Sequence, residues 1–182
     1  MLSFCFVFSR LSRAWPKLVI RFSFFLFRLV ALHAVVGLCL AHADPITLAH
    51  NLHEDGKRVI DNKSPILLLF TAEYCHYCDE VKASVFNLIV ADPAYRDRML
   101  LREVRIDTNL DLVSFSGTVT SHRSFSKTRG IRIVPTLEFL DGAGTPISPP
   151  LVGAGIPDYY GAYVDNGIEQ SLRTLRTRED PS

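Results

Sequence analysis

The first 43 residues of this 182-residue chain contain no acidic side chain, although the whole chain has 19. They carry five basic residues, and their last apolar stretch, residues 29–40, is followed by the small residues of "AHA", which end at Ala43. A basic beginning, a short apolar run and small residues at the −3 and −1 positions predict a secretory signal peptide over residues 1–43. An uncleaved membrane anchor is the alternative, because apolar character extends over residues 24–41, although Arg28 and His33 interrupt it.

The rest of the chain lacks an excess of positive charge. Once the leader's five basic residues are set aside, 15 Lys and Arg stand against 19 Asp and Glu, so this part is mildly acidic. A nucleic-acid-binding protein would need a basic face, and the balance argues against one. Internal repeats are also lacking. The remaining length, about 139 residues, suits one domain with a single core, at residues 44–176, followed by a polar tail at 177–182.

Cysteine and tryptophan are scarce outside the leader. Cys5, Cys39 and the only tryptophan, Trp15, lie within it, so the remainder holds only Cys75 and Cys78. An exported chain would bring these two cysteines into an oxidising compartment, in bacteria the periplasm, where disulfides form. They stand two residues apart in "TAEYCHYCDE", directly after the apolar run "ILLLF". Three roles are open to such a pair: zinc binding, a structural crosslink and redox chemistry.

The apolar patterns predict an α/β fold in the order α-β-α-β-α-β-β-α. The run "SPILLLFTA" is apolar almost throughout, as in a strand buried on both faces, and the segment after it has apolar residues at helical spacing. Thr47 is a possible cap of the first helix, and Gly117 lies in a long polar connection. The expected helices cover residues 45–63, 74–90, 125–130 and 156–176, with a turn and short helix at 92–99, and the expected strands cover 64–72, 100–107 and, as a hairpin, 131–148.

The cysteine pair therefore lies where a buried strand gives way to a helix. Cys75 would cap that helix, and Cys78 would follow one turn later. Unpaired N–H groups and the positive end of the helix dipole lower a thiol pKa at such a position. Because the thiolate is the attacking species in disulfide exchange, Cys75 would be the nucleophile and Cys78 the resolving thiol. His76, if protonated, would make the pair more oxidising, and Tyr77 would also tune it.

Zinc and a structural disulfide are the alternatives to a redox role. A structural zinc site needs four ligands, which Cys75, Cys78, His50 and His53 could supply. The two histidines fall on the first predicted helix, however, without the loop spacing of a zinc knuckle. A structural crosslink across a two-residue spacer closes almost no loop and adds little stability. The strand–helix setting favours redox chemistry, with no metal.

Three segments together resemble the thioredoxin superfamily: "LLFTAEYCHYC", "VRIDTN" and "TRGIRIVPTLEFLDGAG". The resemblance covers about residues 46–175, and the "VPT" follows the second cysteine by 57 residues. It implies a thioredoxin fold, that is, a central mixed β-sheet flanked by helices. It also implies that Pro135 is cis and lies against the cysteine pair, and that the backbone of Val134 pairs with an extended substrate segment. No cofactor is implied, because the cysteines carry the electrons.

The chain departs from the thioredoxin pattern at several positions. Leu69 stands where the family has a buried acid that helps to deprotonate the second cysteine, and Val104 or Glu103 stands where it has a buried lysine. The His-Tyr loop, the Val before the proline and the insertion at residues 110–124 are more similar to exported thioredoxin-like proteins of the SoxW and Dsb kinds.

Together with the leader, these features predict a periplasmic thiol–disulfide oxidoreductase that acts on protein thiols or disulfides and is reductase-like. The compartment implies a membrane electron-transfer partner of the Dsb type, and the chain is expected to be a monomer. A non-catalytic thioredoxin-fold binding module is the alternative from another class. A disulfide oxidase or isomerase is a further one, although an isomerase would need a dimerisation domain for which the chain has no room.

Overall fold

The computed structural model describes residues 46–155 and 157–179. The expected signal peptide at residues 1–43 lies outside these residues. Among the helices that the structure describes, none is both long enough and apolar enough to cross a membrane.

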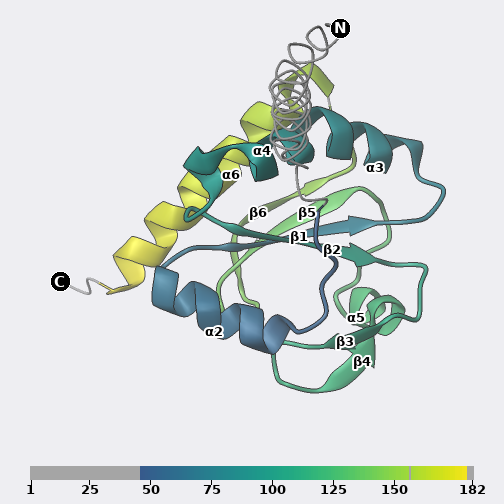
Figure 1. The fold of residues 1–182 in the computed structure, drawn as a ribbon, viewed down its shortest axis with the longest axis horizontal. Helices are drawn as coiled ribbons and strands as arrows, with labels where there is room; N and C mark the ends of the chain where they lie inside the picture. The colour runs from purple at the N-terminus through teal and green to yellow at the C-terminus, as the bar shows by residue number, and fades with distance from the viewer. Residues whose placement is uncertain (1–45, 156, 180–182) are drawn as a thin grey trace, which may run out of the picture. The chain divides into compact units, whose positions relative to one another are not determined.

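A four-stranded sheet in the order β2-β1-β5-β6 forms the centre of the domain (Figure 1). β1 is parallel to β2 and antiparallel to β5, which is in turn antiparallel to β6. This confirms the mixed sheet and the hairpin at its end. β1 is central because every one of its residues is buried, as its unbroken apolar sequence predicts. The strands are β1 (Ile66–Thr71), β2 (Leu100–Arg105), β5 (Thr136–Leu140) and β6 (Pro146–Val152).

Helices cover both faces of the sheet (Figure 1). Alternate residues of β1 divide between two apolar clusters, because successive side chains of a strand point to opposite faces. Leu67 and Leu69 pack toward α3 and α6, whereas Leu68 and Phe70 pack toward α2 and α5. The covering elements are α2 (Leu52–Asn62) and α5 (His122–Thr128) on one face, and α3 (His76–Val81), the π-helical turn η1 (Lys82–Phe86), α4 (Asn87–Ala91) and α6 (Pro157–Glu179) on the other.

The first helix begins later than its apolar pattern predicts. Its cap is Asn51, whose side chain accepts a hydrogen bond from the Glu54 N–H, so the expected cap at Thr47 is wrong. The backbone oxygen of Thr47 instead accepts a hydrogen bond from the Glu103 N–H at 2.9 Å. The segment before α2 thus runs along the edge of β2, where it satisfies backbone groups that would otherwise be unpaired.

The polar connection over residues 108–124 contains regular structure. β3 (Asp111–Val113) and β4 (Val119–Ser121) form an antiparallel hairpin, and Gly117 takes the positive φ of 80° that its turn requires. α5 begins at His122, earlier than expected, because the Ser121 side chain caps it by accepting from the Ser124 N–H.

Two other helices differ from their predicted limits. The expected helix at 74–90 is interrupted by η1, and the expected short helix at 92–99 is the single 3-10 turn η2 (Pro93–Tyr95). α6 continues to Glu179, three residues into the expected polar tail.

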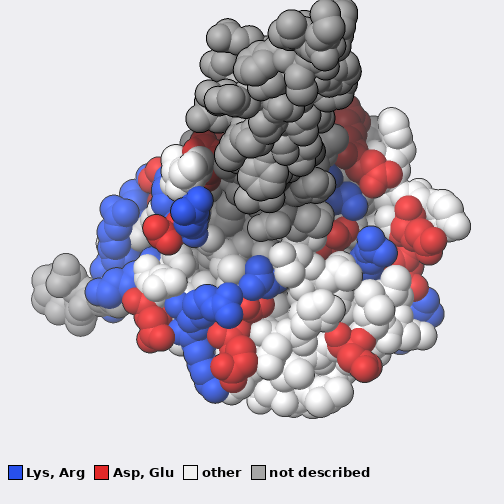
Figure 2. Space-filling view, viewed as in Figure 1, with Lys and Arg blue, Asp and Glu red and all other residues white. Residues whose placement is uncertain are grey.

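Figure 2 shows basic side chains over α6 and α2 at the left of one face, with acidic side chains among them. Few charges lie over the β3–β4 hairpin at the lower right of this face.

Candidate active site at the Cys75–Cys78 pair

Cys75 and Cys78 form a disulfide at the start of the active-site helix. Cys75 is the N-cap of α3, as its position after β1 predicts, and its Sγ accepts a hydrogen bond from the Cys78 N–H at 3.2 Å. Cys75 is partly exposed, whereas Cys78 is fully buried. The two sulfurs are therefore unequal: only Cys75 is open to another molecule, and its sulfur already receives a backbone N–H that would stabilise a thiolate.

The Val134–Pro135 peptide bond is cis, as the resemblance implies. The Pro135 oxygen accepts from the Gly153 N–H at 2.8 Å, and β5 begins at the next residue, Thr136, opposite Phe70 of β1. This pairing places the proline loop beside the strand end that leads to Cys75. Neither backbone group of Val134 has a hydrogen-bond partner among the residues that the structure describes. An extended peptide could pair with these groups.

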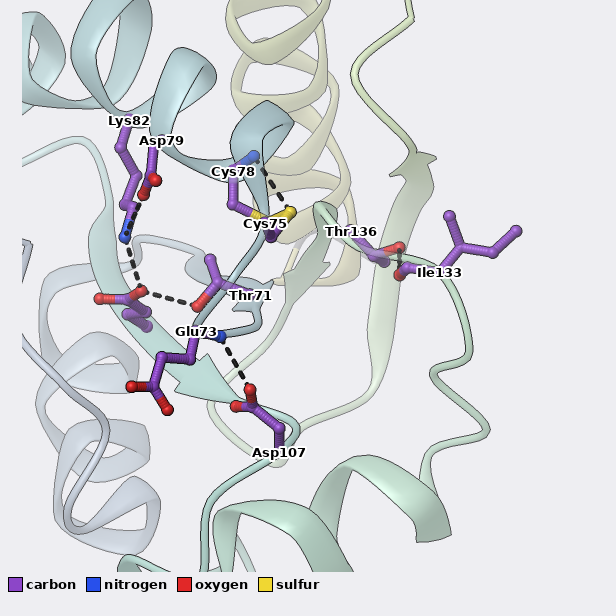
Figure 3. The surroundings of a disulfide bond; sticks show 10 residues. Thr71, Glu73, Cys75, Cys78, Asp79, Lys82, Asp107, Ile133 and Thr136 are labelled. Atoms are coloured by element: carbon purple, nitrogen blue, oxygen red, sulfur yellow. Dashed lines mark hydrogen bonds and ion pairs between the residues drawn. A yellow bond between two sulfur atoms is a disulfide. The ribbon is translucent and has the colours of Figure 1, made fainter.

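A buried carboxylate lies beneath the active-site helix. Glu103 is 5% exposed, and its Oε1 accepts from the Thr71 hydroxyl at 2.7 Å and from the Lys82 ammonium at 3.2 Å. Lys82 also approaches the exposed carboxylate of Asp79 at 3.6 Å. Figure 3 shows Thr71 below the cysteine pair. The Thr71 hydroxyl and the Lys82 ammonium donate to the same carboxylate, that of Glu103. Glu103 and Lys82 neutralise each other's charge in a poorly solvated environment.

Sequence reasoning missed this carboxylate as a site residue. Leu69 pairs in register with Glu103, so the acid absent from β1 has a counterpart directly opposite on β2. The available signal was the alternation of β2: Leu101 packs into the core under the active-site helix, and Glu103, two residues later, faces the same way.

The loop before Cys75 is attached to the end of β2. The Asp107 carboxylate accepts from the Glu73 N–H at 2.8 Å, so Asp107 serves as a turn-fixing residue (Figure 3). His76 and Tyr77 are both exposed on the first turn of α3, with ring centroids 5.9 Å apart. They stand beside the cysteines, where their side chains are open to solvent or to a partner.

The four candidate zinc ligands do not come together. The cysteines are bonded to each other, and His53 Nδ1 is 3.0 Å from the backbone oxygen of Phe115 in the β3–β4 turn. Within residues 46–155 and 157–179, no three His, Cys, Asp or Glu side chains form a group that could hold a metal ion.

The mixed four-stranded sheet, the disulfide at the β1–α3 junction and the cis proline beside it define a thioredoxin fold. The sequence profile of the thioredoxin-like domain matches residues 52–167, which is more than half of the chain. The protein therefore belongs to the thioredoxin-like domain family.

Solved thioredoxin structures show low sequence identity to the chain. Thioredoxin of Malassezia sympodialis is 20% identical, with 73% of this chain and 98% of that chain covered and a TM-score of 0.46. Mitochondrial thioredoxin 3 of Saccharomyces cerevisiae, in its oxidised form, is 18% identical, with 70% and 96% covered and a TM-score of 0.47. Trichomonas vaginalis thioredoxin is 18% identical, with 70% and 97% covered and a TM-score of 0.46. A search of curated protein sequences finds no match to the chain.

Proposed function

We propose that this protein is an exported thiol–disulfide oxidoreductase that exchanges disulfides with other proteins through Cys75 and Cys78. One observation carries the proposal: a partly exposed sulfur at a helix N-terminus is bonded to a fully buried one, beside a cis proline with a free backbone edge. This arrangement suits a nucleophile that must meet a protein partner and a resolving thiol that must not.

The exchange balances without a cofactor. In the reducing direction, the Cys75 thiolate attacks one sulfur of a substrate disulfide, forms a mixed disulfide and releases the other substrate sulfur as a thiolate, which takes up a proton. The Cys78 thiol loses its proton and attacks the Cys75 sulfur, which expels the first substrate sulfur. The protein pair ends as a disulfide, and the substrate has gained two electrons and two protons. The oxidising direction is the same sequence reversed.

The surrounding residues have separate roles in this proposal. The Val134 backbone would hold the substrate segment against Pro135, beside the mixed disulfide. His76 and Tyr77, exposed on the first turn, would tune the stability of the Cys75 thiolate. In a reductase-like direction, Glu103, a buried carboxylate on β2, would serve as the acceptor for the proton that Cys78 must lose.

Two single substitutions test the exchange. In Cys78→Ser the mixed disulfide cannot be resolved, so a substrate protein should remain covalently attached on a non-reducing gel. In Cys75→Ser nothing should be trapped, because the buried Cys78 cannot be reached. A non-catalytic binding module would behave differently. Neither variant would trap a substrate, and the wild-type cysteine pair would not react with any disulfide that is supplied.

Export is a separate part of the proposal, supported by the acid-free basic leader. It places the protein in the periplasm as a monomer served by a membrane electron-transfer partner of the Dsb type. The mass of the protein recovered from a periplasmic extract is the measurement. Cleavage after Ala43 should give a chain that begins at Asp44, whereas an intact chain in the membrane fraction would indicate an anchor.

A further inference from the structure

A basic pocket lies beside the proposed docking edge. It has a volume of about 370 Å³ and is walled by α5, the end of β2 and the loop that leads to the cis proline. Three cationic residues line it, Arg123, Lys127 and Arg132, and Ile106 and Ile131 supply apolar walls. The pocket is distinct from the cysteine pair, and the exchange chemistry described above does not use it.

Two connections fix this basic pocket next to the site. Arg132 is two residues before Val134, so it lies at most about 7 Å further along an extended chain. On the other side, Arg123 donates a hydrogen bond to the backbone oxygen of Asp107, whose carboxylate holds the Glu73 N–H two residues before Cys75. The pocket is thus tied both to the proline loop and to the loop before the nucleophile.

The positive charge of the pocket is available to a ligand. Lys127 and Arg132 are exposed, and neither forms an ion pair or side-chain hydrogen bond with another described residue. The neighbouring Arg129 is different, since its guanidinium is bonded to the Glu138 carboxylate at 2.6 Å. In a domain with more acidic than basic residues, two uncompensated cations in one hollow are a local exception.

Two acids lie near the pocket and limit what it can bind. Asp107 directs one carboxylate oxygen to the Glu73 N–H, while its other oxygen is buried, and the Glu73 side chain is exposed. They weaken the attraction for an anion at the Asp107 end, so the favourable position is toward Lys127 and Arg132. A carboxylate on a flexible side chain can reach that position from a peptide held at Val134.

We propose that this pocket binds an acidic side chain of the substrate protein, a Glu or Asp within two or three residues of its reactive cysteine. The inference rests on the proposed function and deepens it, because it selects substrates by charge. The apolar walls at Ile106 and Ile131 would cover the methylene groups of the side chain, and the cations would bind its carboxylate.

The test compares two disulfide-bonded peptides that differ only in a Glu or a Gln two residues from the cysteine. The reduced protein should react with the Glu peptide about fivefold faster, which corresponds to one partly screened ion pair. The preference should shrink as ionic strength rises, because salt screens exposed charges.

In the double variant Lys127→Gln/Arg132→Gln the two peptides should react equally fast. The matched control, Arg173→Gln/Arg176→Gln, removes the same charge from exposed positions on α6 and should keep the preference.

Two further measurements separate the failure of this inference from the failure of the exchange itself. Hydroxyethyl disulfide, small and uncharged, reports exchange without the pocket, and peptides with Ser in place of Cys report binding without exchange. Exchange with hydroxyethyl disulfide but equal rates for both peptides overturns only the pocket. If no disulfide reacts, the proposed function fails, and the Ser peptides then test the pocket alone. Tighter binding of the Glu peptide that is lost in the double variant supports the pocket. Equal binding of the Glu and Gln peptides overturns it. A double variant that slows both peptides equally also overturns it.

Discussion

At the scale of single residues, Glu103 is the group that most distinguishes this site. Burial of a carboxylate is unfavourable unless it is paired and hydrogen-bonded, and Glu103 has both Lys82 and Thr71 as partners. Among the described residues the other buried acid, Asp55, belongs to α2 and pairs with Arg102 on the opposite face of the sheet. Glu103 is therefore the one buried carboxylate that the structure describes beneath the active-site helix.

We expect Glu103→Gln to slow the resolving step by about tenfold or more, because a neutral amide cannot accept the Cys78 proton. The first attack, by Cys75, should keep its rate. Single-turnover quenching with acid would then show the mixed disulfide accumulating. Asp79→Asn is the control, since it removes an exposed charge from the same lysine. Resolution of Glu103→Gln at the wild-type rate would exclude this role.

At the scale of elements, two glycines of α6 have opposite surroundings. A Cβ added at Gly161 would lie 3.9 Å from Val85, an ordinary contact. At Gly167 it would lie 2.2 Å from the ring of Phe139, which is fully buried in β5 and cannot move aside. Of these two positions, Gly167 is therefore the one at which α6 packs closely against the sheet. Gly161 is not required by packing, and there glycine only lowers the helix propensity.

The two substitutions by alanine should change stability in opposite directions. Gly161→Ala should raise the free energy of unfolding by up to about 1 kcal/mol, because alanine restricts the unfolded chain and favours the helix. Gly167→Ala should lower it by about 1–3 kcal/mol through overpacking. Urea titrations followed by circular dichroism measure both. Equal effects at the two positions would mean that α6 does not pack on β5 as described.

The elements that could be predicted from sequence are those with a local signal. The apolar run of β1, the cysteine pair after it and the Gly-rich turn of the hairpin each lie within a short window, and their types were predicted correctly. The alternation of β2 was the one local signal for Glu103, and it was missed because a charged residue in a strand usually indicates an exposed face and its partner Lys82 is 21 residues distant. The late start of α2 was missed for a similar reason: the segment before it pairs with β2, far along the chain.

At the scale of the whole molecule, His122 connects three distant segments. It begins α5, its Nδ1 accepts from the Arg105 N–H of β2 at 3.0 Å, and its Nε2 donates to the Ala49 oxygen before α2 at 2.8 Å. The side chain is fully buried. The fold uses the neutral form of His122 to join the hairpin insertion to the sheet.

This burial predicts how stability depends on pH. Loss of solvation holds the pKa of His122 below its usual 6.5, although the hydrogen bond to Ala49 opposes the shift. The unfolded chain therefore binds the proton more readily, and the free energy of unfolding should fall as pH drops below about 6.5, by at most about 1.4 kcal/mol per pH unit. Above that pH neither state is protonated there, and the contribution is constant. Urea titrations between pH 8 and pH 5 measure the slope.

His122→Gln should be less stable at pH 8 but should lose less stability on acidification, because the titrating group is gone. Parallel profiles for the two proteins would show that His122 is not the group responsible.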